Sequence, residues 1–114
     1  MKIKFVFLVG LLLPQMLLAR SYESSDVGVI NKLVTFANYG NGDVYVTLPT
    51  NGVTCKYGYF VNKNSNGYES TLSSLLAAYQ AQTPIIIHGL TANDKRWSGS
   101  NNPVCEIYSV EYRR

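Results

Sequence analysis

The stretch Tyr68–Leu90, YESTLSSLLAAYQAQTPIIIHGL, decides the expected fold because its hydrophobic period changes once along its length. Asn66, with Glu69 three residues later, is typical of a capping arrangement at the start of a helix. The spacing then predicts a helix of about 14 residues, which ends before Pro84 because proline interrupts helical hydrogen bonding. Residues 84–90 follow as an apolar run, which predicts a strand buried on both faces. The apolar face of the helix consists of Tyr68, Leu72, Leu75, Leu76 and Tyr79.

Three strands are expected before this helix. Residues 27–36 have apolar side chains at both odd and even positions. This pattern predicts a long first strand whose two faces are each buried at different points along its length. Residues 43–48 alternate in polarity and place inward Val44, Val46 and Leu48. Residues 56–61 are expected to form the third strand, with one face made of Tyr57, Tyr59 and Val61.

After the buried strand, residues 91–103 are polar and predict a loop, and residues 105–112 predict a last strand. The resulting order, β-β-β-α-β-β, is that of the oligonucleotide/oligosaccharide-binding (OB) barrel, a five-stranded Greek-key barrel. We therefore expect a mainly β fold with one helix, arranged as a small five-stranded OB-fold-like barrel. The alternative is an open antiparallel sheet with one helix packed on it.

Residues 1–21 have the layout of a secretory signal peptide, with two lysines before an apolar run over residues 5–19. As a helix this run would span about 22 Å, short of the roughly 30 Å hydrocarbon core of a membrane, so no retained membrane segment is expected. Cleavage after Ser21 and cleavage after Ala19 both fit the pattern. We expect a single small domain over residues 22–114, located in the periplasm or secreted.

The formal charge of +3 comes from that leader, which holds Lys2, Lys4 and Arg20. From Tyr22 onward, the basic and acidic residues balance. Binding a phosphate backbone requires a positive surface, so nucleic acid is not an expected ligand.

Export also bears on Cys55 and Cys105. In an oxidising compartment, two cysteines in a domain of this size form one disulfide. The loop that it closes has about 50 residues, for which the chain-entropy description gives on the order of 4 kcal/mol. Neither a further cysteine nor a histidine lies at metal-ligand spacing, so we expect no metal site and no cofactor.

His88 is the only histidine of the chain and follows three isoleucines in an expected strand. A structural or edge-exposed histidine is the favoured interpretation, because no nucleophile in a recognisable local setting accompanies it. The acidic residues show no spacing that pairs two carboxylates for acid–base work. The chain is therefore not expected to be an enzyme, and a small hydrolase working through His88 is the alternative.

Tyrosine is the most informative residue type, because all nine tyrosines lie beyond the leader. A tyrosine ring offers an apolar face with a polar tip, which suits sugar rings, peptides and protein partners. The second and third strands commonly carry the ligand face of an OB barrel, and the loop after the fourth strand lies beside it. The ligand-binding residues expected on these grounds are Tyr45, Tyr57, Tyr59, Asn93, Asp94 and Trp97. The alternative is that the tyrosines are core and cross-strand filler, whereas Trp97 is harder to bury among Asn, Ser and Gly.

The chain resembles the small secreted B subunits of bacterial toxins, in particular those of the subtilase-cytotoxin and typhoid-toxin type. The likeness consists of the leader, the element order, the few cysteines, the stretch Ser25–Ile30, and the passage from Leu75–Tyr79 through Thr83–Ile87. In that family the B subunit has no catalytic role, forms a ring of five, and binds sialylated or related glycans through a serine near the start of the first strand. By position, Ser24 or Ser25 with Asp26 matches that site.

These observations predict an exported, non-enzymatic binding domain that recognises a carbohydrate through a face lined by Tyr and Trp. The resemblance further implies that the domain forms a homo-oligomer, namely a pentamer, and that the serine site takes part in binding. The alternative is a periplasmic or secreted protein-interaction module, such as an inhibitor or an assembly component.

Overall fold

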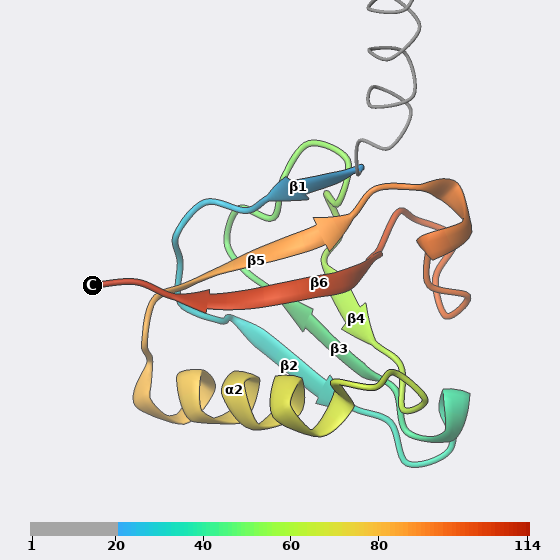
Figure 1. The fold of residues 1–114 in the computed structure, drawn as a ribbon, viewed down its shortest axis with the longest axis horizontal. Coiled ribbons are helices and arrows are strands. Elements are labelled where there is room, and N and C mark those ends of the chain that lie inside the picture. The colour runs from blue at the N-terminus through green and yellow to red at the C-terminus, as the bar shows by residue number, and fades with distance from the viewer. Residues whose placement is uncertain (1–20) are drawn as a thin grey trace, which may run out of the picture.

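A computed structural model describes residues 21–114, so the predicted leader lies outside the described residues apart from Ser21. Figure 1 shows one curved sheet with a single α-helix running below its strands. The strands are β1 (Tyr22–Ser24), β2 (Lys32–Thr35), β3 (Val44–Thr47), β4 (Tyr59–Val61), β5 (Ile85–Leu90) and β6 (Cys105–Tyr112). Helix α2 spans Tyr68–Ala81, and two short 3-10 helices are η1 (Tyr39–Asn41) and η2 (Asn93–Lys95). The expected mainly β fold with one helix is confirmed.

The strands form one six-stranded sheet in the order β1-β5-β6-β4-β3-β2. All neighbouring pairs are antiparallel except β4 and β6, which run parallel and pair at Tyr59 with Cys105 and at Phe60 with Glu106. The sheet has two edges, β1 and β2, so the closed five-stranded barrel is not confirmed.

The predicted single first strand over residues 27–36 is wrong, because the chain changes its pairing partner within that stretch. The Gly28 amide donates to the Ile85 carbonyl at 3.0 Å, and the Ile85 amide donates back to Gly28 at 2.9 Å. Only three residues later, the Asn31 amide donates to the Thr47 carbonyl at 3.1 Å. The segment thus leaves β5 and joins β3, so that Gly28 forms only an isolated bridge to Ile85 and the strand within this stretch is limited to β2, whereas β1 lies ahead of it.

The predicted helix and the strand after it are confirmed. Helix α2 has 14 residues and closes at Gln82, whose left-handed φ of 54° lets its amide donate to the last turn ahead of Pro84. The predicted capping by Asn66 and Glu69 is wrong, because Gly67 occupies the N-cap position and no side chain caps the helix. Strand β5 follows with its first three residues, all isoleucine, buried.

The buried face of α2 is rotated from the predicted one. Leu75 and Ala78 are buried, whereas Leu76 and Tyr79 are exposed. The helix packs against β6 and β4, and Figure 1 shows it below the sheet, running roughly along the direction of β6 in this view. Only these two helix residues are buried, so a narrow apolar stripe is enough for the helix to pack on the core.

The main core lies inside the curl of the sheet. Val44 and Val46 of β3 and Ile85 and Ile87 of β5 belong to one buried cluster, although these two strands are not neighbours in the sheet. The inward alternation predicted for Val44, Val46 and Leu48 is confirmed. Because strand side chains alternate between faces, Tyr45, Phe60 and His88 belong to the opposite, outer face.

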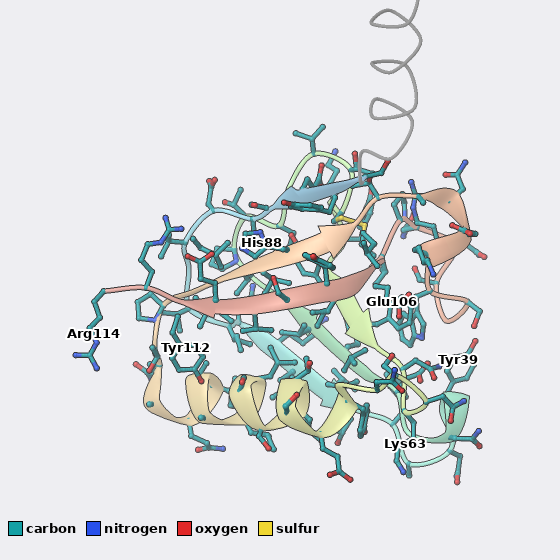
Figure 2. All side chains as sticks on the ribbon, viewed as in Figure 1. Tyr39, Lys63, His88, Glu106, Tyr112 and Arg114 are labelled. Atoms are coloured by element: carbon teal, nitrogen blue, oxygen red, sulfur yellow. A yellow bond between two sulfur atoms is a disulfide. The ribbon has the colours of Figure 1, made fainter. Side chains whose placement is uncertain are left out.

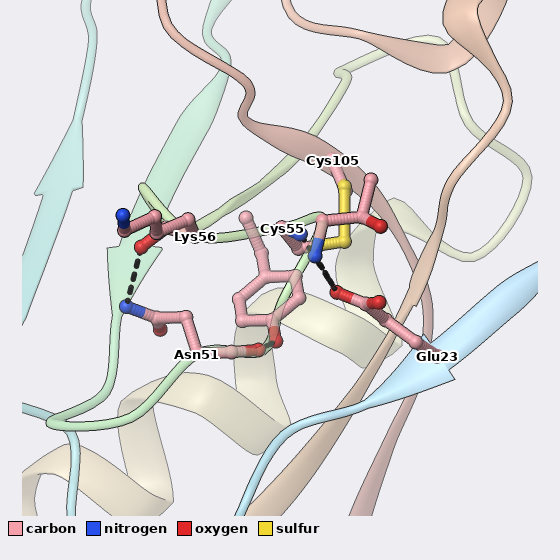
Figure 3. The surroundings of a disulfide bond; sticks show 7 residues. Glu23, Asn51, Cys55, Lys56 and Cys105 are labelled. Carbon is pink, nitrogen blue, oxygen red and sulfur yellow. Dashed lines mark hydrogen bonds between the residues drawn. A yellow bond between two sulfur atoms is a disulfide. The ribbon is translucent and has the colours of Figure 1, made fainter.

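The predicted disulfide between Cys55 and Cys105 is present, with a Cα–Cα distance of 5.4 Å and both cysteines fully buried. It anchors the chain just before β4 to the first residue of β6, where the parallel ladder begins. Figure 3 shows Glu23 reaching from β1 to this region, where its Oε1 accepts hydrogen bonds from the amides of Thr54 at 2.8 Å and Cys55 at 2.7 Å. The disulfide therefore lies where both halves of the sheet and β1 meet.

Within residues 21–114, no helix has the length and apolar character needed to cross a membrane. A buried disulfide is compatible with an extracellular or periplasmic protein.

Candidate ligand-binding surface

Five of the eight ligand residues predicted from the sequence fall into two separate groups. Ser25 and Asp26 follow β1, which pairs with β5 at one edge of the sheet. Tyr45 of β3, Tyr57 and Trp97 gather near the other edge, where the Tyr45 hydroxyl donates to the Tyr57 carbonyl at 2.6 Å. The structure thus does not join the predicted residues into one site.

Trp97 is only 8% exposed, so the expectation that it is hard to bury is wrong. The loop after β5 folds back over the outer face, and the indole packs against four other aromatic rings at centroid distances of 5.4–5.9 Å. We call this group the Trp97 cluster, and it consists of Phe36, Tyr39, Tyr45, Phe60 and Trp97. Burial raises the pKa of the Tyr45 hydroxyl above its ordinary value. Most of this cluster is a second small core.

Asp43 holds the Trp97 cluster in place. Its carboxylate, 2% exposed, accepts a hydrogen bond from Trp97 Nε1 at 2.9 Å and another from Asn62 Nδ2 at 3.1 Å. Gly40 has a φ of 59° and lies so close to this carboxylate that any side chain there would collide with it. Three loops that are distant in sequence therefore meet at one buried carboxylate.

Tyr59 belongs to the main core rather than to a ligand face. Its ring has no exposed surface, and its hydroxyl donates to the carbonyl of Asn51. Burial raises the pKa of this hydroxyl well above the usual tyrosine range, and the nearby Glu23 carboxylate adds to the effect. Asn93 and Asp94, in contrast, lie exposed on η2.

Ser25 has a structural role in the strand pairing. Its side chain is buried, and its Oγ accepts from the Ile87 amide at 3.0 Å and donates to the Asp26 carbonyl at 2.9 Å. Its neighbour Ser24 points to the outer face and is exposed. Of the two serines that the family resemblance offers, only Ser24 can reach a ligand.

Ser24 is the first member of a chain of polar contacts across three strands. Its Oγ lies 2.7 Å from His88 Nδ1 on β5, and His88 Nε2 lies 2.8 Å from Glu111 Oε1 on β6. A carboxylate can only accept, so Nε2 carries a proton, and in the neutral ring Nδ1 accepts from Ser24. The second oxygen of Glu111 accepts from Arg113 at 2.6 Å. Figure 2 shows the labelled His88 over β5 in the middle of this face.

Two exposed tyrosines border this polar chain. The rings of Tyr22 and Tyr108 stack with centroids 5.1 Å apart and an interplanar angle of 19°. Tyr22 is 47% exposed and Tyr108 46%, and the Tyr22 ring meets His88 edge-on at 6.3 Å. We call this region the tyrosine–histidine surface, and it consists of Tyr22, Ser24, His88, Tyr108, Glu111 and Arg113.

The carboxylate of Glu111 stays ionised over a wide range of pH. The hydrogen bond from His88, followed by the one from Arg113, holds the pKa of this carboxyl below its ordinary value. Its stabilising contribution is therefore present above the ordinary glutamate pKa and is lost as the pH falls through the lowered one. At neutral pH Glu111 is therefore a hydrogen-bond acceptor for both His88 and Arg113.

The pairing register of β1, β5 and β6 brings these side chains together. Their spacing in the sequence alone does not reveal this proximity. Ser24 pairs with His88, and the β5–β6 ladder shifts register between His88 and Gly89. Gly89 is required there, because a Cβ would lie 2.7 Å from the Tyr59 ring and 3.0 Å from Cys55 Sγ. The only sequence signal for this region was His88 in an apolar strand, together with Ser24 from the family resemblance.

The arrangement is suited to binding a hydroxylated ligand. Hydroxyl, imidazole, carboxylate and guanidinium groups provide donors and acceptors beside two aromatic faces. A hydroxyl, an imidazole and a carboxylate joined by hydrogen bonds also occur in enzymes that use an activated serine as nucleophile. Such enzymes in addition hold hydrogen-bond donors for the oxyanion, in a site that excludes water. Here the serine stands on an open sheet face. Binding is therefore the better supported chemistry.

Within residues 21–114, no group of three or more His, Cys, Asp or Glu side chains is placed to hold a metal ion. Comparison with family models, with curated proteins and with solved structures finds no match for this chain.

Proposed function

We propose that the chain is an exported, non-enzymatic domain that binds carbohydrate at the tyrosine–histidine surface. The observation that carries this proposal is the exposed, stacked pair Tyr22 and Tyr108 next to the hydrogen-bonded row from Ser24 to Glu111. A sugar ring has apolar C–H faces and a rim of hydroxyls, so it requires both kinds of contact. The row is already ordered before the ligand arrives, which lowers the entropic cost of binding.

The family resemblance supports the same surface. B subunits of the subtilase-cytotoxin and typhoid-toxin type bind glycans through a serine near the start of the first strand. By position Ser24 or Ser25 matches that serine, and Ser24, the last residue of β1, is the exposed one of the two. We also propose that the fold is an OB barrel whose first strand is divided into β1 and β2. The strand order supports this, because β1 and β2 are consecutive in the chain and occupy the two edges of the sheet.

Replacement of Tyr22 by alanine is expected to weaken glycan binding about tenfold, because one exposed ring of the stacked pair is lost. Binding is measured on a glycan array with sialylated and neutral members, and then by titration of the best binder. Tyr79→Ala is the matched control, since Tyr79 is a similarly exposed tyrosine on α2, and this substitution is expected to leave binding unchanged.

Thermal melting of both variants shows whether the fold is intact, and β1 contributes no residue to the main core. A blank array with folded wild-type protein would reject the carbohydrate proposal. Co-purification of one protein partner under the same conditions would then establish the protein-interaction alternative.

The resemblance extends the proposal to a ring of five copies. Light scattering on the protein without its leader is expected to give the mass of a pentamer. A monomer at micromolar concentration would contradict ring formation without touching the glycan proposal.

A further inference from the structure

A second region of the outer face has the chemistry of a sugar site. A shallow hollow of about 360 Å³ lies beside the Trp97 cluster. We call it the Phe60 hollow, and its lining consists of Phe60, Asn62, Asn64, Ser65 and Glu106. An aromatic side, two amides, a hydroxyl and a carboxylate are the groups that hold a polyhydroxylated ring.

One polar side chain of this hollow is held by hydrogen bonds within the protein, and another can accept hydrogen bonds from a ligand. Asn62 donates to Asp43 and accepts from the Asn64 amide at 2.8 Å, so its amide plane is held in one orientation. Glu106 forms no ion pair within residues 21–114, although it is half-buried. A carboxylate in that position gains by accepting hydrogen bonds from a ligand.

Strand β6 connects the Phe60 hollow to the tyrosine–histidine surface. Cys105 points into the core, so Glu106 and then Tyr108 lie on the outer face, two residues apart, which corresponds to about 7 Å along a strand. Figure 2 shows the labelled Glu106 near the start of β6, where β6 pairs with β4, and the labelled His88 over β5. One ligand of a few sugar residues can therefore contact both regions.

We infer that the Phe60 hollow is a second subsite, which binds the inner residues of an oligosaccharide whose terminal residue lies on the tyrosine–histidine surface. The inference rests on the proposed function and deepens it, because it assigns chain-length selectivity to this protein. A monosaccharide fills only the first region, whereas a longer ligand also reaches Glu106 and Asn64.

The test compares short and long probes by NMR titration of labelled protein without its leader. The probe pairs are methyl sialoside with sialyllactose, and methyl galactoside with lacto-N-tetraose. For the pair that binds, the longer probe is expected to bind about tenfold more tightly, and only the longer probe should shift the amide signals of residues 62–65.

Glu106→Ala and Asn64→Ala are expected to reduce this advantage to less than about threefold, while the affinity for the short probe stays unchanged. Glu69→Ala on the first turn of α2 is the matched control and should preserve the full advantage. Equal affinity of short and long probes, or equal weakening of both by Glu106→Ala, overturns the second subsite and leaves the proposed function standing. Binding of neither pair overturns both.

Discussion

Replacement of Asp43 by alanine is expected to lower the free energy of unfolding by about 3 kcal/mol. The Asp43 carboxylate is buried and accepts from both the Trp97 indole at 2.9 Å and the Asn62 amide at 3.1 Å. Its loss leaves two polar groups without partners and opens a gap beside Gly40. Urea unfolding measures the effect, and the chain offers an internal probe because Trp97 is its only tryptophan.

The fluorescence of Trp97 separates local from global damage. In Asp43→Ala, the emission of the folded protein should shift to longer wavelength, because the indole loses its acceptor and gains contact with water. Asp26→Ala is the matched control, since Asp26 is an exposed aspartate and its loss should change stability by less than about 0.5 kcal/mol. An Asp43→Ala protein as stable as the control, with unshifted emission, would show that the buried carboxylate does not organise the Trp97 cluster.

Removal of the disulfide in the double variant Cys55→Ala, Cys105→Ala is expected to cost about 4 kcal/mol of stability. The two cysteines are 50 residues apart, so the crosslink removes much of the freedom of the unfolded chain. The bond also reinforces a weak point of the sheet, because β4 and β6 are joined by only two register pairs. The measurement is urea unfolding followed by Trp97 emission.

Wild-type protein under reducing conditions supplies the control for this variant. Its unfolding curve should approach that of the double variant, and thiol titration of the denatured, unreduced protein without its leader should find no free thiol. A loss below about 1 kcal/mol would mean that the native pairing of β4 and β6 does not depend on the crosslink.

The elements predicted well from sequence are those whose signal is local. Helix α2 and β5 follow from a change of period around Pro84, and β3 follows from strict alternation over four residues. The first strand was predicted as one element because no local signal marks the point between Gly28 and Asn31 where the chain changes partner. Pairing partners depend on distant strands, which a single stretch of sequence does not contain.

Dependence on distant parts of the chain also explains why the candidate site was predicted only in part. Trp97 was expected to be exposed because its sequence neighbours are polar, but its burial depends on Asp43, which lies 54 residues earlier. Ser24, His88 and Glu111 carry no motif, because their proximity arises from the register of three strands and the shift at Gly89. The resemblance to toxin B subunits implies Ser24 or Ser25 with Asp26, of which Ser25 is buried in the structure, whereas composition alone predicts ligand contacts for Tyr45 and Trp97 of the Trp97 cluster.

The tyrosine–histidine surface draws its members from opposite parts of the described chain. Ser24 and His88 are 64 residues apart in sequence, and Glu111 lies 23 residues beyond His88. Contacts of such separation form slowly and late, because the intervening loops must close first. A nascent or partly folded chain can therefore hold helix α2 and the β2–β3 hairpin and still lack the tyrosine–histidine surface. The proposed ligand surface is therefore complete only when β1, β5 and β6 have all paired, and a ligand that binds there would stabilise that state alone.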